Sequence, residues 1–326
     1  MLLQGESSKN KRKRANLMIE ELPDHAAMSD IGLERVINED RCSVISTKAG
    51  VCFLVLDGMG GAEGGEYAAQ SSVDIIQRYL TQSEHPDLVD ALRNALTEAN
   101  QNIVFRRQNP LFKEMGTTIV CALIEGSVVA ISHVGDSRAY LLHGDEIRQL
   151  TVDHTYVQHL VDQQEIAPED ALPHPQSHIL TRCLGSSADL VIDVDRYWIW
   201  PLEDGTAPDL LLLCTDGLYS LIEEEEISRV VRTLEPSEAC QELIRIANDR
   251  GGFDNITVSI IPLFGHLRKE ELPTQVEHTV PQEQRRRASW WQRSLIVHVM
   301  LACMLAAGAS LLATGIFLYF KVFGGF

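Results

Sequence analysis

The stretch VCFLVLDGMGG (residues 51–61) is an apolar run that ends at an aspartate followed by glycines. Short runs rich in Val, Ile and Leu are typical of buried β-strands, and Asp-Gly is a turn signal. The chain contains three further runs of this kind, most of them ending at Gly or Asp-Gly: TTIVCALI (117–124), SVVAISHVGD (127–136) and PDLLLLCTDG (208–217). The pattern therefore predicts buried strands, several of which end in a carboxylate.

Helix-like periodicity is confined to a few segments between these strands, at residues 64–81, 86–107 and 237–249. A regular alternation of strand and helix would indicate a parallel sheet. Many short strands with helices between only some of them instead favour mixed antiparallel sheets, which places the chain in the α+β class.

The charge balance of the predicted globular part is strongly acidic. Residues 28–264 hold 16 basic and 38 acidic side chains, a balance of −22 within a chain whose formal charge is −18. A domain this acidic repels phosphate backbones, so we expect no nucleic-acid partner. It is suited to collecting divalent cations.

The seven cysteines lie at long, irregular spacings, and no C-x-x-C pair is present for zinc or for thioredoxin-like redox chemistry. Most lie in apolar runs, where a free cysteine behaves as a small buried hydrophobe. We therefore expect reduced thiols and an intracellular domain.

Carboxylates follow or precede four of the strand-like runs. Asp57 and Asp216 each follow an apolar run and precede a glycine, Asp254 precedes a third run, and Glu39-Asp40 precedes a fourth. One aspartate at a strand end is usually a turn former. Four such ends favour a metal site instead, and an all-oxygen ligand set suits Mg²⁺ or Mn²⁺.

Eight segments, in a fixed order and at compatible spacings over residues 28–262, resemble the metal-dependent (PPM, type 2C) Ser/Thr protein phosphatases, particularly the bacterial members. The segments are RVINEDR (35–41), LDGMGG (56–61), EMGTT (114–118), HVGDSRAYLL (133–142), LTVDHT (150–155), LTRCLG (180–185), CTDGLYS (214–220) and FDNITV (253–258). The resemblance implies an αββα sandwich, in which two antiparallel β-sheets are flanked by helices and the metals lie in a cleft at one edge.

The resemblance also implies a centre with two Mn²⁺ or Mg²⁺ ions. Asp57 matches the aspartate that bridges both ions, and the carbonyl of Gly58 contacts the second ion. Asp216 and Asp254 match the remaining ligands of the first ion. Two divalent ions about 3.5–4 Å apart activate a shared water for in-line attack on a phosphate ester.

Four further positions carry roles over from the family. Glu39 matches a residue that binds the second ion directly or through water, and Asp40 matches one that holds metal-bound waters. Asp136 matches a residue that recruits a third metal ion in bacterial relatives, and the motif leaves its occupancy open. Arg35 matches the arginine that binds substrate phosphate; the alternative is a salt bridge to a neighbouring carboxylate.

The chain departs from the family at Met59, where some members carry a histidine that protonates the leaving alkoxide. A metal-bound water or another side chain must then act as the acid. His133 and His154 lie inside motifs and are interpreted as structural residues. Residues 156–181 match the flap that borders the cleft in bacterial relatives, and we expect this flap to select substrates.

The predicted function is protein Ser/Thr phosphatase, acting on phosphorylated proteins and opposing a cognate Ser/Thr protein kinase in bacterial signalling. One alternative is a phosphoprotein-binding module of the same fold with little turnover, which predicts lost metal ligands. The other is a two-metal hydrolase of another class, such as a nuclease. The acidic domain and the ordered motifs argue against the nuclease.

The two ends of the chain differ from the predicted domain at 28–264. Residues 1–27 form a polar, basic tail, and residues 265–293 form a polar linker that ends in a basic cluster. Residues 294–320 carry no formal charge and are long enough to cross a bilayer, which leaves residues 321–326 as a short tail. The arginines before this segment predict a single-pass membrane protein with a cytoplasmic catalytic domain.

Overall fold

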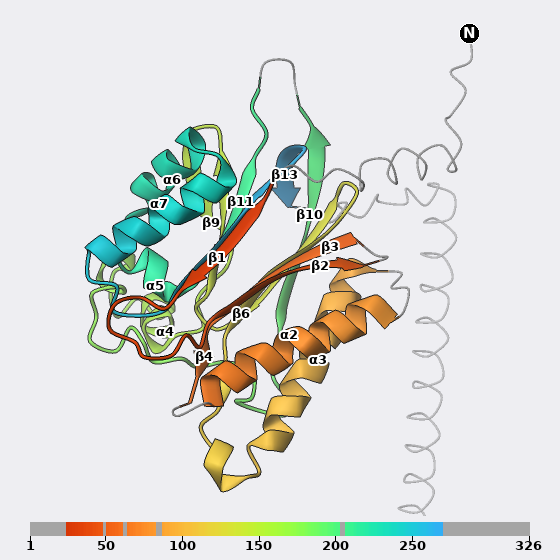
Figure 1. The fold of residues 1–326 in the computed structure, drawn as a ribbon, viewed down its shortest axis with the longest axis vertical. Helices are drawn as coiled ribbons and strands as arrows, with labels where there is room; N and C mark the ends of the chain where they lie inside the picture. The colour runs from red at the N-terminus through yellow and green to blue at the C-terminus, as the bar shows by residue number, and fades with distance from the viewer. Residues whose placement is uncertain (1–23, 48–49, 61–63, 83–86, 203–205, 270–326) are drawn as a thin grey trace, which may run out of the picture. The chain divides into compact units, whose positions relative to one another are not determined.

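Two antiparallel β-sheets stack face to face, with helices on both outer faces (Figure 1). This computed structural model describes residues 24–47, 50–60, 64–82, 87–202 and 206–269. The layers follow the order helix, sheet, sheet, helix, so the predicted α+β class and αββα arrangement are confirmed.

All strand pairs in the sheets are antiparallel. The larger sheet has the order β13 (Gly265–Lys269), β10 (Asp193–Pro201), β7 (Val128–Val134), β6 (Ile119–Glu125), β3 (Gly50–Leu56) and β2 (Arg41–Thr47). The smaller sheet has the order β1 (Ala26–Asp30), β12 (Ile256–Pro262), β11 (Leu210–Cys214), β8 (Arg138–His143) and β9 (Glu146–Gln149). Two short strands, β4 (Gly58–Met59) and β5 (Gly116–Thr117), pair separately.

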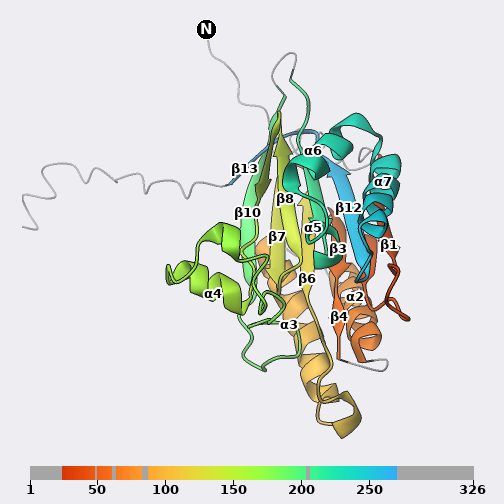
Figure 2. The same ribbon diagram turned by 90° about the vertical axis from the view of Figure 1, so that its left-hand side faces the viewer.

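The helices divide between the two outer faces (Figure 1). The larger sheet is covered by α2 (Gly64–Gln82) and α3 (Leu88–Arg106). The smaller sheet is covered by α5 (Asp216–Tyr219), α6 (Glu224–Thr233) and α7 (Pro236–Asp249). A further helix, α4 (Tyr156–Asp162), belongs to the connection between β9 and β10 and projects to one side of the sheets (Figure 2).

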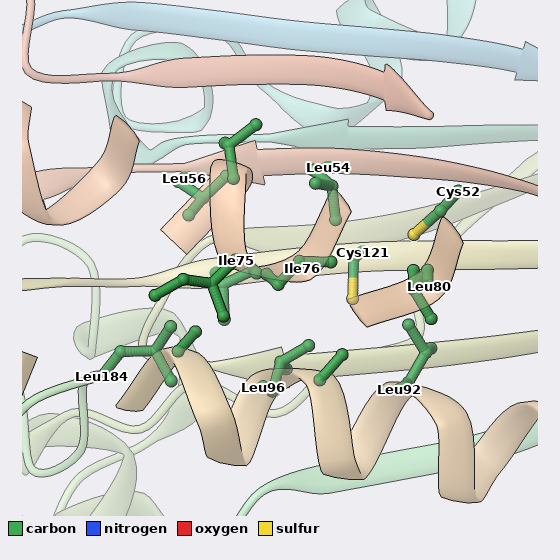
Figure 3. Close-up of a cluster of buried hydrophobic side chains, with 14 of the residues drawn as sticks. Cys52, Leu54, Leu56, Ile75, Ile76, Leu80, Leu92, Leu96, Cys121 and Leu184 are labelled. Carbon is green, nitrogen blue, oxygen red and sulfur yellow. The ribbon is translucent and has the colours of Figure 1, made fainter. Parts of the chain in front are cut away.

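Burial alternates along β3 between two cores. Cys52, Leu54 and Leu56 pack against α2 and α3, as Figure 3 shows, whereas Phe53 and Val55 pack between the sheets. Successive side chains of a strand point to opposite faces, so a strand covered on both faces must be apolar at every position. This is why residues 51–56, VCFLVL, form an unbroken apolar run.

The predicted helices and strands agree with the structure to within a few residues at their ends. Helix α3 begins one position after Asp87, whose side chain accepts hydrogen bonds from the backbone N–H groups of Val89 and Asp90 at 2.9 and 3.1 Å. This N-cap explains why the helix starts later than the predicted residue 86.

The sheets extend past both predicted domain limits, 28 and 264, because β1 begins at Ala26 and β13 pairs with β10. The β13 sequence GHLRK is mostly polar, but Leu267 is buried between the sheets. In the part of the chain that the structure describes, no helix is long and apolar enough to span a bilayer. The predicted membrane segment 294–320 lies outside the described residues, as do nearly all of the two predicted tails and the rest of the linker.

Candidate metal centre and phosphate-binding cleft

A cleft of about 660 Å³ opens at one end of the sandwich. Every predicted site residue except Asp40 lines it, and other residues complete the lining. The full set is Arg35, Glu39, Asp57, Gly58, Met59, Gly60, Arg107, Glu114, Asp136, His178, Leu180, Cys183, Ser186, Asp216 and Asp254. The structure therefore brings together residues that are more than 200 positions apart in the sequence.

The antiparallel order of the strands explains this convergence. Asp57 directly follows β3, Asp136 follows β7, and Asp216 follows β11. The end of β11 lies beside the beginning of β12, which Asp254 precedes. Both sheets thus deliver carboxylates to the same edge, two from each sheet.

Two threonines of the EMGTT segment fix the backbone of Asp57. The N–H of Asp57 donates to Thr118 Oγ1 at 3.1 Å, and its carbonyl accepts from the N–H of Thr118 at 2.8 Å and from Thr117 Oγ1 at 2.9 Å. Thr118 Oγ1 also lies 2.7 Å from Ser137 Oγ, next to Asp136. One buried hydroxyl therefore connects the loops that carry two of the acids.

Glycines allow the loops of the cleft to approach closely. A Cβ added to Gly58 would lie 2.3 Å from the carbonyl oxygen of Gly65 in α2, and one added to Gly217 would lie 2.0 Å from that of Asn255. Both distances are far below van der Waals contact. The glycine after each of the two aspartates therefore serves close packing around the site.

Asp40 lies behind the cleft, fully buried. Its Oδ2 accepts hydrogen bonds from the hydroxyls of Thr215 and Thr257, at 2.9 and 2.7 Å, and its Oδ1 is buried without a partner. Burial raises the pKa of Asp40 to about 7, although the two hydroxyls oppose the shift. Glu39, by contrast, lines the cleft, and its backbone N–H donates to Asn255 Oδ1 at 2.8 Å.

The carboxylates of the cleft destabilise one another's charged forms. Burial raises the pKa of Asp57 well above its usual range, and the charges of Asp40, Asp216, Asp136 and Asp254 add to the shift. Burial, followed by the charge of Asp216, also raises the pKa of Asp136. The pKa of Asp216 is raised to about 6 by burial and then by Asp254.

This arrangement fits a multivalent cation. Asp216 Oδ1 and Asp40 Oδ1 are buried oxygens without hydrogen-bond partners, and a buried carboxylate with no partner is costly. Oxygen ligands of this kind suit hard ions such as Mg²⁺ and Mn²⁺. The residues present therefore fit the metal centre predicted from the sequence.

Arg35 lies at the mouth of the cleft, with 46% of its side chain exposed. Its Nη2 donates to Asp254 Oδ2 at 2.7 Å, and its Nη1 lies 3.9 Å from Glu39 Oε2. The salt bridge that was the alternative for Arg35 is therefore present, and it places the guanidinium beside the carboxylates. The salt bridge and phosphate binding are compatible roles for Arg35, because its guanidinium also lines the open cleft.

The cleft includes side chains to which the sequence assigned no role. Arg107, at the end of α3, lines it and donates through Nε to the carbonyl of Lys113 at 2.8 Å. His178 and Cys183 come from the long connection between β9 and β10. The predicted flap therefore borders the cleft. His178 is the only histidine among the described residues that line it. No local pattern identifies Arg107 as a cleft residue, because its proximity depends on the fold.

The protein phosphatase 2C family model matches residues 34–248, more than half of the chain. The chain belongs to the protein phosphatase 2C family. A serine/threonine phosphatase (Stp) of Listeria innocua is 38% identical over 245 residues, which span 72% of this chain and 93% of the relative. The structure of the S. agalactiae serine/threonine phosphatase has a TM-score of 0.68 at 30% identity and covers 73% of this chain and 98% of its own.

A further structure in this family is the catalytic domain of the serine/threonine protein phosphatase PstP in complex with two manganese ions. It has a TM-score of 0.62 at 33% identity, and the match covers 74% of this chain and 98% of the PstP chain.

The raised pKa values predict a pH-dependent response to metal. A carboxyl whose pKa is higher in the folded state binds protons more tightly there, so without metal the stability falls as pH rises from about 4 towards 7. We expect Mn²⁺ to raise the melting temperature over that in EDTA, and more at about pH 7.5 than at about pH 5. Asp216→Asn should reduce this difference and the exposed control Asp189→Asn should keep it; a Mn²⁺ effect independent of pH would contradict the account.

Thr118→Val removes the shared hydroxyl while nearly keeping the side-chain shape. The Asp57 N–H loses its acceptor, and residues that orient metal ligands typically contribute about 10–100-fold to metal affinity. We expect Mn²⁺ affinity, measured by titration calorimetry, to fall by about that factor. Thr81→Val, an exposed change in α2, should leave it unaltered. Parental affinity in Thr118→Val would show that the threonine has no positioning role.

Proposed function

We propose that this chain is a protein serine/threonine phosphatase that hydrolyses phosphoserine and phosphothreonine esters with Mn²⁺ or Mg²⁺ in the cleft. The observation that carries the proposal is the convergence of buried carboxylates, among them Asp216 with an unpartnered oxygen, in an open cleft beside Arg35. Relatives named as serine/threonine phosphatases support the substrate class, and the PstP complex supports two ions.

The residues divide into metal ligands and groups that handle the substrate. Asp57, the carbonyl of Gly58, Asp216, Asp254 and Glu39 would hold the two ions. Such ions, when bound, supply a water activated for attack on phosphorus.

Three other residues complete the proposed site. Asp136 would serve a third ion and Asp40 would hold metal-bound waters. The guanidinium of Arg35 offers planar donors for two phosphoryl oxygens, which a lysine would match less well.

A cysteine-based mechanism fits the cleft poorly. Cys183 is the only cysteine among the described residues that line the cleft, and burial raises the pKa of its thiol. The thiolate is the nucleophilic form, so a raised pKa makes Cys183 a weak nucleophile. A non-catalytic phosphoprotein-binding module is also disfavoured, because Asp57, Asp216 and Asp254 are all present in the cleft.

The direct test is phosphate release from a phosphothreonine peptide with Mn²⁺, with Mg²⁺ and with EDTA. We expect release with either ion and none with EDTA. Asp57→Asn should lower kcat by about 10³-fold or more, because it weakens both metal sites. The exposed Asp189→Asn should behave as the parent. Near-parental turnover in Asp57→Asn would remove the proposed bridging role.

Arg35 is tested by separating KM from kcat. Arg35→Ala removes charge-assisted hydrogen bonds to phosphate, so KM for the phosphopeptide should rise by about 10–100-fold. Arg35→Lys should recover only part of this loss, because an ammonium group cannot make the bidentate contact. An unchanged KM in Arg35→Ala would limit Arg35 to its ion pair with Asp254.

We also propose a single-pass membrane anchor at residues 294–320, with the catalytic domain in the cytoplasm. The support is an uncharged segment of 27 residues preceded by Arg285, Arg286, Arg287 and Arg293. The substrates of the phosphatase would then include phosphorylated proteins near the membrane. A Ser/Thr kinase in the same membrane would oppose the phosphatase.

Removal of the segment tests the anchor. The full chain should sediment with membranes, whereas residues 1–290 should remain in the soluble fraction and still release phosphate. Recovery of the full chain in the soluble fraction would contradict the anchor. Loss of activity in residues 1–290 would mean that the segment contributes to catalysis as well.

A further inference from the structure

A second group of metal-binding side chains lies at the end of the sandwich away from the cleft. His143 is the last residue of β8, Asp209 directly precedes β11, and His266 is the second residue of β13. Asp136 comes just before the other end of β8, so at 3.3 Å per residue the group lies about 20 Å from the cleft. The sequence gives no sign of this group, because 66 and 57 positions separate the histidines from the aspartate.

The two imidazoles converge on one carboxylate oxygen. His143 Nδ1 lies 2.8 Å and His266 Nδ1 lies 2.9 Å from Asp209 Oδ1. The three potential ligand atoms all lie within 4.8 Å of one another. The ring centroids are 4.9 Å apart at 74°, so the imidazoles meet edge to face and both point at the aspartate.

The aspartate is held rigidly in this position. Its side chain is only 1% exposed, and its second oxygen accepts from the N–H of Leu267 at 2.7 Å. Its backbone N–H donates to Gly265 at 3.0 Å, and its carbonyl accepts from Leu263 at 2.8 Å. One carboxylate oxygen is thus fixed by the fold, and the other is left to the histidines.

The histidines provide both orientation and access. His266 is mostly buried, and its Nε2 lies 3.2 Å from Thr206 Oγ1. A hydrogen bond at the second ring nitrogen orients an imidazole ligand. His143 is 56% exposed and lines a cavity of about 210 Å³ together with Glu146 and His266, so an ion can enter from solvent.

A second His-His-Asp group in the fold shows what a site closed to metal looks like. There, His154 Nδ1 accepts from the N–H of Gly135 at 3.1 Å and its Nε2 lies 3.2 Å from the guanidinium of Arg182. His133 Nε2 is engaged by the carbonyl of Val152 at 2.8 Å. These ring nitrogens already make hydrogen bonds to the backbone, which agrees with the structural role predicted for His133 and His154.

We propose that His143, Asp209 and His266 form a binding site for a divalent transition-metal ion of the zinc class. Imidazole nitrogen with one carboxylate suits Zn²⁺, whereas the all-oxygen set of the cleft suits Mg²⁺ and Mn²⁺. The two sites therefore select different ions. Arg268 and Arg148 also line the cavity, but the Arg268 guanidinium stacks over Trp200 at 5.1 Å.

An ion here would connect the two layers of the sandwich. His143 and Asp209 belong to the smaller sheet and its approach, and His266 belongs to the larger sheet. The ion would bind three segments that are distant in the unfolded chain, so it would stabilise the folded state by an amount that rises with the logarithm of the free-ion concentration above the Kd. It would also fix β13, the last described strand, which occupies the first five residues of the predicted linker.

The test is the melting temperature of the full chain, titrated with Zn²⁺ in excess Mg²⁺ so that the cleft is occupied. At a free Zn²⁺ concentration 100 times the Kd, we expect the melting temperature to rise by about 5–10 °C. His143→Asn and His266→Asn should abolish the rise. His159→Asn, an exposed histidine in α4, should keep it.

Two further outcomes decide between this site and the cleft. Asp57→Asn should show the same Zn²⁺ response as the parent, and Co²⁺ should give a visible absorption band that His143→Asn lacks. The proposal is overturned if the parent does not respond to Zn²⁺ or if His143→Asn responds as the parent does. A response lost in Asp57→Asn would likewise overturn it, because Zn²⁺ would then act at the cleft.

Discussion

Repulsion among buried carboxylates is the constraint on which the rest of this structure depends. Burial and mutual charge raise the pKa values of Asp57, Asp136 and Asp216, and burial alone disfavours each ionised form. A chain could avoid this cost by leaving the acids apart in exposed turns. Here two sheets with apolar strands bring them to one edge, and oxygens of Asp40 and Asp216 remain unpartnered. The packing energy of the sandwich thus maintains a site whose negative charge a bound cation would offset.

Local contacts fix the positions of the carboxylates that the sheets bring together. Thr118 links the backbone of Asp57 to Ser137, and Gly58 and Gly217 let neighbouring loops approach to distances that no side chain would permit. These residues contribute little to the apolar cores. Their role is to set where the carboxylates lie, which is what separates a metal centre from a surface cluster of acids.

Features that depend on a residue and its neighbours in the chain could be predicted from the sequence. The run before Asp57 indicates a strand buried on both faces, and the motifs around Asp57, Asp216 and Asp254, through the family resemblance, predict that these residues share one site, as their common place in the cleft shows. Contacts that depend on register could not be predicted. Arg107 reaches the cleft only through the fold, and His143 meets His266 because the end of β8 lies beside the beginning of β13. The sequence predicts a linker at residues 265–269, where the structure has strand β13, because this segment is mostly polar and its buried Leu267 gives no strand pattern.

The carboxylates of the cleft, on the reasoning above, serve to hold divalent cations. Crystals of the protein grown with Mn²⁺ and measured at the manganese absorption edge would show whether they do. We expect anomalous peaks in the cleft, at positions where Asp57, Asp216 and Asp254 would hold the ions. A cleft without anomalous density, in a protein that releases phosphate under the same conditions, would contradict this role of the carboxylates.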